Sequence, residues 1–63
     1  MKKYYIHTAH YNYDEGCWEW RADHPYHTTM QGAEKQMEYL QSIYPYKKYC
    51  IFSEHYLGLP ITQ

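Results

Sequence analysis

The residues of this chain that could ligate a metal ion are five histidines and two cysteines. Four histidines form two His-x-x-His pairs, His7 with His10 and His24 with His27. Positions three apart on a strand point to opposite faces, so the first pair cannot hold one ion, and Pro25 leaves the geometry of the second undetermined. Cys17 and Cys50 lack Cys-x-x-Cys spacing. We therefore predict no metal site and no other cofactor.

No set of nucleophile, base and orienting group is apparent in the sequence. Cys17 follows Gly16, but neither a phosphate-binding glycine loop nor a nucleophile motif lies beside it. Glu19, Arg21 and Asp23 recur at every second position, a spacing that predicts a solvated row of charges on one face of a strand. We predict no catalytic residue and no enzymatic activity.

Tyrosine is the most informative residue type, because ten tyrosines cannot all lie inside a chain of 63 residues. A tyrosine ring offers a large rigid contact area and a hydroxyl group, with few rotamers to freeze on binding. The alternative is that these rings shield a thin sheet or lie under the C-terminal tail. The candidate binding residues are the tyrosines of the first predicted strand and their polar neighbours: Tyr5, His7, Tyr11, Tyr13, Glu19 and Arg21.

The length of the chain predicts one domain over residues 1–63. Leu, Ile, Val and Phe together number only 8, whereas 21% of the residues are aromatic, so aromatic side chains must supply much of the core. At this size burial barely exceeds the entropy cost of folding, which favours help from a partner subunit. The net charge of −1 gives no basic excess for nonspecific binding to phosphate.

Two strands are predicted at the N-terminus, over residues 3–13 and 17–23, from their β-favouring residues and the alternation in the second. Asp14-Glu15-Gly16 suits a three-residue hairpin turn with Gly16 at positive φ. That turn pairs Tyr13 with Cys17 and brings Ile6, Thr8, His10, Asn12, Trp18, Trp20 and Ala22 to one core face. The six candidate binding residues then share the opposite face.

A helix is predicted from about residue 29 to 44, with Thr28 and Gln31 as a capping box and Tyr44-Pro45 as its end. Its apolar stripe is expected to bring Met37 and Leu40 into contact with Trp18 and Trp20. A third strand is predicted over residues 47–56.

These elements predict an α+β fold, a ββαβ unit with a three-stranded antiparallel or mixed sheet in the order 2-1-3 and one helix packed on one face. Both outer strands would be edges. Residues 57–63 form an apolar tail, and its uncharged stretch 57–61 is expected to pack on its own domain or on another chain. The thin core, the edges and the tail favour a homodimer or a higher homo-oligomer.

The order of elements resembles that of AP2-type and integrase-arm DNA-binding domains, which present a three-stranded sheet to the major groove. The resemblance is carried by Trp18-x-Trp20-x-Ala22 ahead of a helix containing Ala33, and it covers about residues 4–40. It implies a nucleic-acid-binding module. The chain departs from that pattern because a groove-facing sheet needs several Arg or Lys, whereas Arg21 stands here between Glu19 and Asp23. Direct binding to nucleic acid is therefore disfavoured, although stacking on single strands stays open.

The N-terminal residues lack the apolar stretch of a secretion signal, and no window is long and apolar enough to span a membrane, so we expect a cytoplasmic protein. The initial Met leads us to expect a complete gene product of the size of phage or mobile-element accessory proteins. The predicted function is binding and inhibition of a larger host protein, such as a defence protein, through the tyrosine-rich face. Two alternatives remain, a homo-oligomer that sequesters a nucleotide-like ligand and the nucleic-acid-binding module. In a phage-encoded protein the compartment would be the host cytoplasm.

Overall fold

The computed structural model describes residues 1–62 and contains one helix with a four-stranded antiparallel sheet, which confirms the α+β class. The elements are β1 (Tyr5–Asn12), β2 (Cys17–Ala22), α1 (Met30–Ile43), β3 (Tyr49–Phe52) and β4 (Leu59–Pro60). The strand order is β3-β1-β2-β4. The central place of β1 between β2 and β3 is confirmed, whereas the predicted count of three strands is wrong because β4 adds to the free side of β2.

The turn between β1 and β2 contains four residues, one more than the sequence pattern predicted. The side-chain oxygen of Asn12 accepts hydrogen bonds from the main-chain N–H groups of Asp14 and Glu15, at 3.0 and 3.1 Å. The N–H of Gly16 donates to the Asn12 carbonyl at 2.7 Å, and Gly16 has the positive φ expected of it, +68°. Cys17 therefore pairs with Asn12 and not with Tyr13.

This one-residue difference moves β2 relative to the faces of β1. Ala9 now lies opposite Trp20, and Tyr11 lies opposite Trp18. Since residues directly opposite one another share a face, both tryptophans lie on the face away from Ile6 and Thr8. The predicted core face is thus correct for β1 and wrong for β2.

The N-cap of helix α1 lies one residue later than predicted, because the predicted capping box began at Thr28. Its N-cap is Thr29, whose hydroxyl accepts a hydrogen bond from the N–H of Gly32 at 3.1 Å. A Cβ atom on residue 32 would lie 3.0 Å from that hydroxyl oxygen, so glycine permits the close approach. The helix ends at Ile43, and its C-cap Tyr44, whose N–H donates to the carbonyl of Leu40, lies just ahead of Pro45 as predicted.

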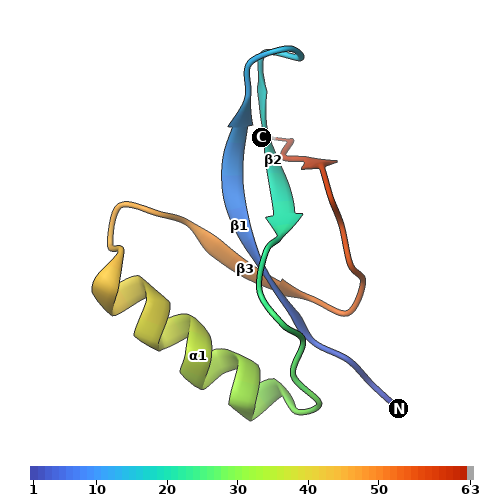
Figure 1. Ribbon diagram of the computed structural model, residues 1–63, viewed down its shortest axis with the longest axis vertical. Helices are drawn as coiled ribbons and strands as arrows, with labels where there is room; N and C mark the ends of the chain where they lie inside the picture. Colours follow the sequence, from blue (N-terminus) through green and yellow to red (C-terminus); the bar gives the residue numbers. More distant parts are fainter. Residues whose placement is uncertain (63) are drawn as a thin grey trace.

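The core between α1 and the sheet is small. Ile6, Ala33 and Leu40 are its buried members, and partly buried side chains from α1, from β3 and from the residue just before β1 pack around them: Met37, Tyr49, Ile51 and Tyr4. Met37 and Leu40 therefore belong to the core as predicted, but the predicted contact with Trp18 and Trp20 is wrong because these rings lie on the other face. Figure 1 shows α1 alongside β3 and the start of β1, with the β1–β2 turn at the far end of the molecule.

The C-terminal segment returns along β2. The third strand is shorter than predicted and ends at Phe52; the Tyr56 carbonyl then accepts the N–H of Ala22 at 2.8 Å. β4 follows and pairs with β2, with Leu59 opposite Trp20. The described part of the tail thus packs on its own domain and covers one predicted edge, while Gln63 lies outside the described residues. Within residues 1–62, β3 pairs with β1 alone.

The core assignment predicts the effect of shortening Leu40, which is 7% exposed. Leu40→Ala should lower the free energy of unfolding by about 2–5 kcal/mol, a large part of the stability of so small a domain. Urea denaturation followed by circular dichroism measures the change. The neighbouring Tyr39→Ala is the control, because Tyr39 is 60% exposed and its loss should change the value by less than about 0.5 kcal/mol. Equal denaturation midpoints for the two variants would contradict the assignment.

Candidate binding surface

The pairing of β1 with β2 and β3 divides the sheet into two faces. Thr8 of β1 pairs with both Arg21 of β2 and Tyr49 of β3, so the three share the face on which α1 packs. We call it the helix-side face. The other face, which we call the open face, carries Tyr5, His7, Ala9, Tyr11, Trp18, Trp20 and Ala22, with Lys48, Cys50 and Phe52 beside them.

The structure does not bring the six predicted binding residues together on one face. Tyr5, His7 and Tyr11 lie on the open face, and Tyr13 lies in the turn with its ring 5.0 Å from that of Tyr11. Glu19 and Arg21 lie on the helix-side face, because the longer turn shifts β2 by one residue. Their shared face is therefore a wrong prediction, and the binding role of each residue stays a prediction.

The half of the open face nearest the N-terminus of β1 is covered by the chain itself. His7 is fully buried between the rings of Phe52 and Tyr56, with centroid distances of 4.8 and 5.6 Å. Tyr5 packs against Tyr26 and His55. These two predicted binding residues have structural neighbours on this face, which matches the alternative that some rings shield the sheet.

His7 forms two hydrogen bonds that require a neutral ring. Its Nδ1–H donates to the Tyr5 carbonyl at 3.0 Å, and its Nε2 accepts the N–H of Tyr56 at 3.0 Å. Burial lowers the pKa of His7 below its ordinary value of 6.5, and the charge of His55 lowers it further, against the opposing effect of the Tyr5 hydrogen bond. The sequence pattern gave no signal that this histidine would be interior.

The half of the open face near the turn is exposed and aromatic. Tyr11, Tyr13 and Trp18 are 39, 88 and 51% exposed. Tyr11 contacts the other two rings edge-on, at 5.0 Å from Tyr13 and 5.4 Å from Trp18. We call these three residues the aromatic cluster. Trp18 was missed from the sequence because the three-residue turn placed it in the core.

A hollow of about 900 Å³ adjoins the aromatic cluster on the open face. Its lining includes Ala9, Trp18, Trp20 and Ile61 from the sheet side, and Lys47 and Lys48 from the segment that leads into β3. Ala9 is the smallest side chain at the centre of this face, and it lies opposite Trp20. The hollow exists because a methyl group stands where the neighbouring positions carry large side chains.

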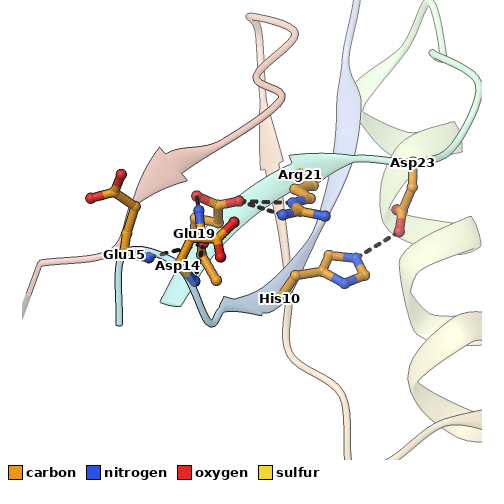
Figure 2. Close-up of polar contacts among 7 residues, drawn as sticks. His10, Asp14, Glu15, Glu19, Arg21 and Asp23 are labelled. Carbon is orange, nitrogen blue, oxygen red and sulfur yellow. Dashed lines mark hydrogen bonds and ion pairs between the residues drawn. The ribbon is translucent and has the colours of Figure 1, made fainter. Parts of the chain in front are cut away.

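The helix-side face of the hairpin carries a row of polar contacts, which Figure 2 shows. The Arg21 guanidinium contacts the Glu19 carboxylate at 2.7 and 2.8 Å, and the Asn12 amide donates to the same carboxylate at 3.2 Å. These two partners hold the pKa of Glu19 below its ordinary value. Arg21 is thus already paired within the chain, although its side chain is 44% exposed.

Asp23 continues the row beyond the end of β2. Its carboxylate accepts hydrogen bonds from the Thr8 hydroxyl and the His10 ring, both at 2.9 Å, and lies 3.2 Å from the His24 ring (Figure 2 shows the His10 contact). Burial raises the pKa of Asp23, but the hydrogen bonds from His10 and Thr8 outweigh it, so the pKa lies below its ordinary value. The row stabilises the hairpin through these hydrogen bonds and the Glu19–Arg21 ion pair.

Within residues 1–62, no group of three or more His, Cys, Asp or Glu side chains is arranged to hold a metal ion, and Cys17 and Cys50 are free thiols. In the same range no helix is long and apolar enough to cross a membrane. Comparisons of the chain with models of protein families, with curated proteins and with solved structures found no match.

The buried neutral His7 predicts that acid destabilises the fold in two steps. Because its folded pKa lies below 6.5, the unfolded chain binds the proton first, and stability falls as the pH drops below about 6.5 until the folded pKa is passed. The lowered pKa values of Glu19 and Asp23 add a second loss below their ordinary values of 4.5 and 3.8. Thermal unfolding between about pH 8 and 3 measures both steps.

Two variants separate the contribution of His7 from that of other histidines. His7→Phe should be less stable at neutral pH but should lose most of the slope between about pH 7 and 5. His55→Gln, at an exposed position, removes only the smaller effect of the His55 charge on the pKa of His7 and should keep most of that slope, because burial is the larger cause. An unchanged slope in His7→Phe would contradict the assignment of this step.

Proposed function

We propose that the protein is a non-enzymatic binding protein that engages a larger protein through its aromatic cluster. The observation that carries the proposal is the exposure of Trp18 and Tyr13 at the end of the hairpin, where the fold leaves them uncovered. Large aromatic side chains dominate the binding energy of protein interfaces. Three contiguous rings also differ from the isolated exposed side chains that are ordinary on protein surfaces.

The arrangement of the cluster supports tight binding at low entropic cost. Tyr11 lies between Tyr13 and Trp18 and contacts both rings edge-on, an orientation that is favourable for aromatic pairs. The rings are therefore partly ordered before any partner arrives, so less side-chain freedom is lost on binding. A short hairpin that projects from the domain can reach into a concave surface on a larger molecule.

The exposed aromatic cluster supports action by occupancy, because it offers contact area to a partner. We place the protein among small accessory proteins that inhibit a larger host protein, such as a defence protein, by covering one of its surfaces. The polar row supplies no free cation beside the cluster, because Arg21 is paired with Glu19. This pairing also weakens the alternative of a sheet that reads a DNA groove, since β1 and β2 carry no Arg or Lys on the open face.

A photo-crosslinker at position 13 tests the proposal in lysate of the cells that carry the gene. A benzophenone amino acid at this position should give a discrete protein adduct, and the same group at the exposed helix position 39 is the matched control. Excess unlabelled parent protein should abolish the adduct, whereas Trp18→Ala should do so only at a several-fold higher concentration. Adducts of equal strength from both positions, or none from position 13, would contradict the proposal.

Affinity measurements with the captured partner then compare the two faces of the hairpin. Trp18→Ala and Tyr11→Ala should each weaken binding by more than about 1 kcal/mol, as interface anchors do. Arg21→Ala, on the helix-side face, should change binding by less. The reverse order in calorimetric titrations would move the binding surface to the helix-side face.

A further inference from the structure

We propose that the hollow beside the aromatic cluster binds a nucleoside phosphate, either free or as part of a single strand. This site differs from the proposed protein-binding surface in its centre, which is Ala9 and not the turn. The two share only Trp18, which belongs to the cluster and also forms one wall of the hollow.

The walls of the hollow suit a planar aromatic group. Trp18 and Trp20 lie two residues apart on the same face of β2. Ala9, on the neighbouring strand β1, is paired with Trp20 and is the small side chain beside it. Trp20 is held by an edge-on contact with Phe52 at 6.0 Å, whereas Trp18 is half exposed. A base can therefore stack on the indole of Trp20, which Phe52 holds in place. Such stacking does not depend on which base is bound.

The opposite wall supplies positive charge. Lys47 and Lys48 line the hollow, and among the described residues no carboxylate does. The Lys47 ammonium lies 4.7 Å above the Tyr44 ring, a contact that positions it without neutralising it. Glu19, the acidic residue of β2, faces the other side of the sheet and is paired with Arg21. Lys48, whose carbonyl accepts the N–H of Ala9 at the centre of the hollow, therefore offers a cation with no competing carboxylate among the described lining residues. Lys47 can join it by leaving the Tyr44 ring.

The size of the hollow admits a ligand of this class. About 900 Å³ lies within the range of small-molecule sites, roughly 300–1,000 Å³, and exceeds what a lone phosphate needs. Trp18 and Trp20 line one side, and Tyr46 lines the other side together with the two lysines, so the hollow suits a molecule that joins a planar ring to a phosphate. A nucleoside phosphate joins these two parts across a ribose.

Titration of the purified full-length protein with ATP, followed by tryptophan fluorescence, tests the site. ATP should quench the emission saturably below about 1 mM, and added salt should weaken it. Adenosine, which lacks phosphate, should bind about tenfold more weakly or worse. A twelve-nucleotide oligo-dT distinguishes the sources: tighter binding than ATP identifies a strand, and weaker binding identifies the free nucleotide.

Two variants address the hollow by separate means. Ala9→Leu fills its centre, and the double substitution Lys47→Gln with Lys48→Gln removes its charge; each should weaken ATP or oligo-dT binding at least about tenfold. The double substitution Lys2→Gln with Lys35→Gln removes the same charge away from the hollow; it is the matched control and should bind as the parent does. Circular dichroism checks the fold, and the lysine variant decides alone if Ala9→Leu does not fold.

Tyr13→Ala separates this proposal from the protein-binding function, because Tyr13 belongs to the cluster but does not line the hollow. It should bind the nucleotide probe normally while losing the protein partner. Absence of saturable quenching with both ATP and oligo-dT, or binding that the lysine variant leaves unchanged, would overturn the proposal whatever the crosslinking experiment shows.

Discussion

The hydrogen bonds of the Asn12 side chain determine which residues of this protein face the helix and which face outward. One amide oxygen holds the N–H groups of Asp14 and Glu15 and thereby lengthens the turn to four residues. Side chains alternate along a strand, so each added residue in the turn exchanges the faces of β2. The position of both tryptophans, and hence the hollow and the aromatic cluster, depends on this turn.

A second constraint follows from the first, because a sheet with tryptophans on its open face needs cover there. The chain meets this need with residues 53–60, which return along β2 and are tied to β1 through His7. Tyr56 makes both connections, with its N–H to the His7 ring and its carbonyl to Ala22. The apolar side chains are thereby divided between two thin layers. One lies between α1 and the sheet, and the other lies between the sheet and the C-terminal segment. This division explains how a domain with only three buried hydrophobic side chains between its helix and its sheet gains further packing from aromatic rings.

Local patterns in the sequence predicted the elements well and their relative placement less well. The strands around the turn, the helix up to Tyr44 and the central position of β1 follow from alternation, the apolar stripe and Pro45. The helix start was predicted one residue too early, because threonine is a good N-cap at both position 28 and position 29. In the structure Thr29 is the N-cap, since its hydroxyl accepts the Gly32 N–H. β4 could not be predicted from the sequence, because it contains only Leu59 and Pro60 and is too short to show an alternation of polar and apolar residues.

The sequence predicted the type of candidate site, an aromatic surface, but not the full set of residues that form it. Tyrosine excess indicated an aromatic binding surface, and Tyr11 and Tyr13 are part of the exposed cluster. His7 and Tyr5 could not be separated from them by pattern, because they share a face with Tyr11 and differ only in what the distant residues 52–56 cover. Trp18 was not predicted as exposed, because the predicted register of β2 was wrong. An asparagine side chain often accepts a hydrogen bond from the N–H two residues later in a turn, so Asn12 was a signal for the longer turn.

The two halves of the open face now have different physical roles. Near the N-terminus of β1 its side chains are buried by the C-terminal segment, so substitutions there act on stability. Near the turn, Tyr13 and Trp18 remain exposed to water, although Ile61, just after that segment, lies beside Trp18 and donates its N–H to the Trp18 carbonyl. The tail thus covers the main chain of β2 at this point and leaves the indole ring exposed. Exposed aromatic area is unfavourable for a free chain in water, and its burial against a ligand or partner would recover that free energy. This asymmetry is the physical reason to seek function at the turn end of the sheet.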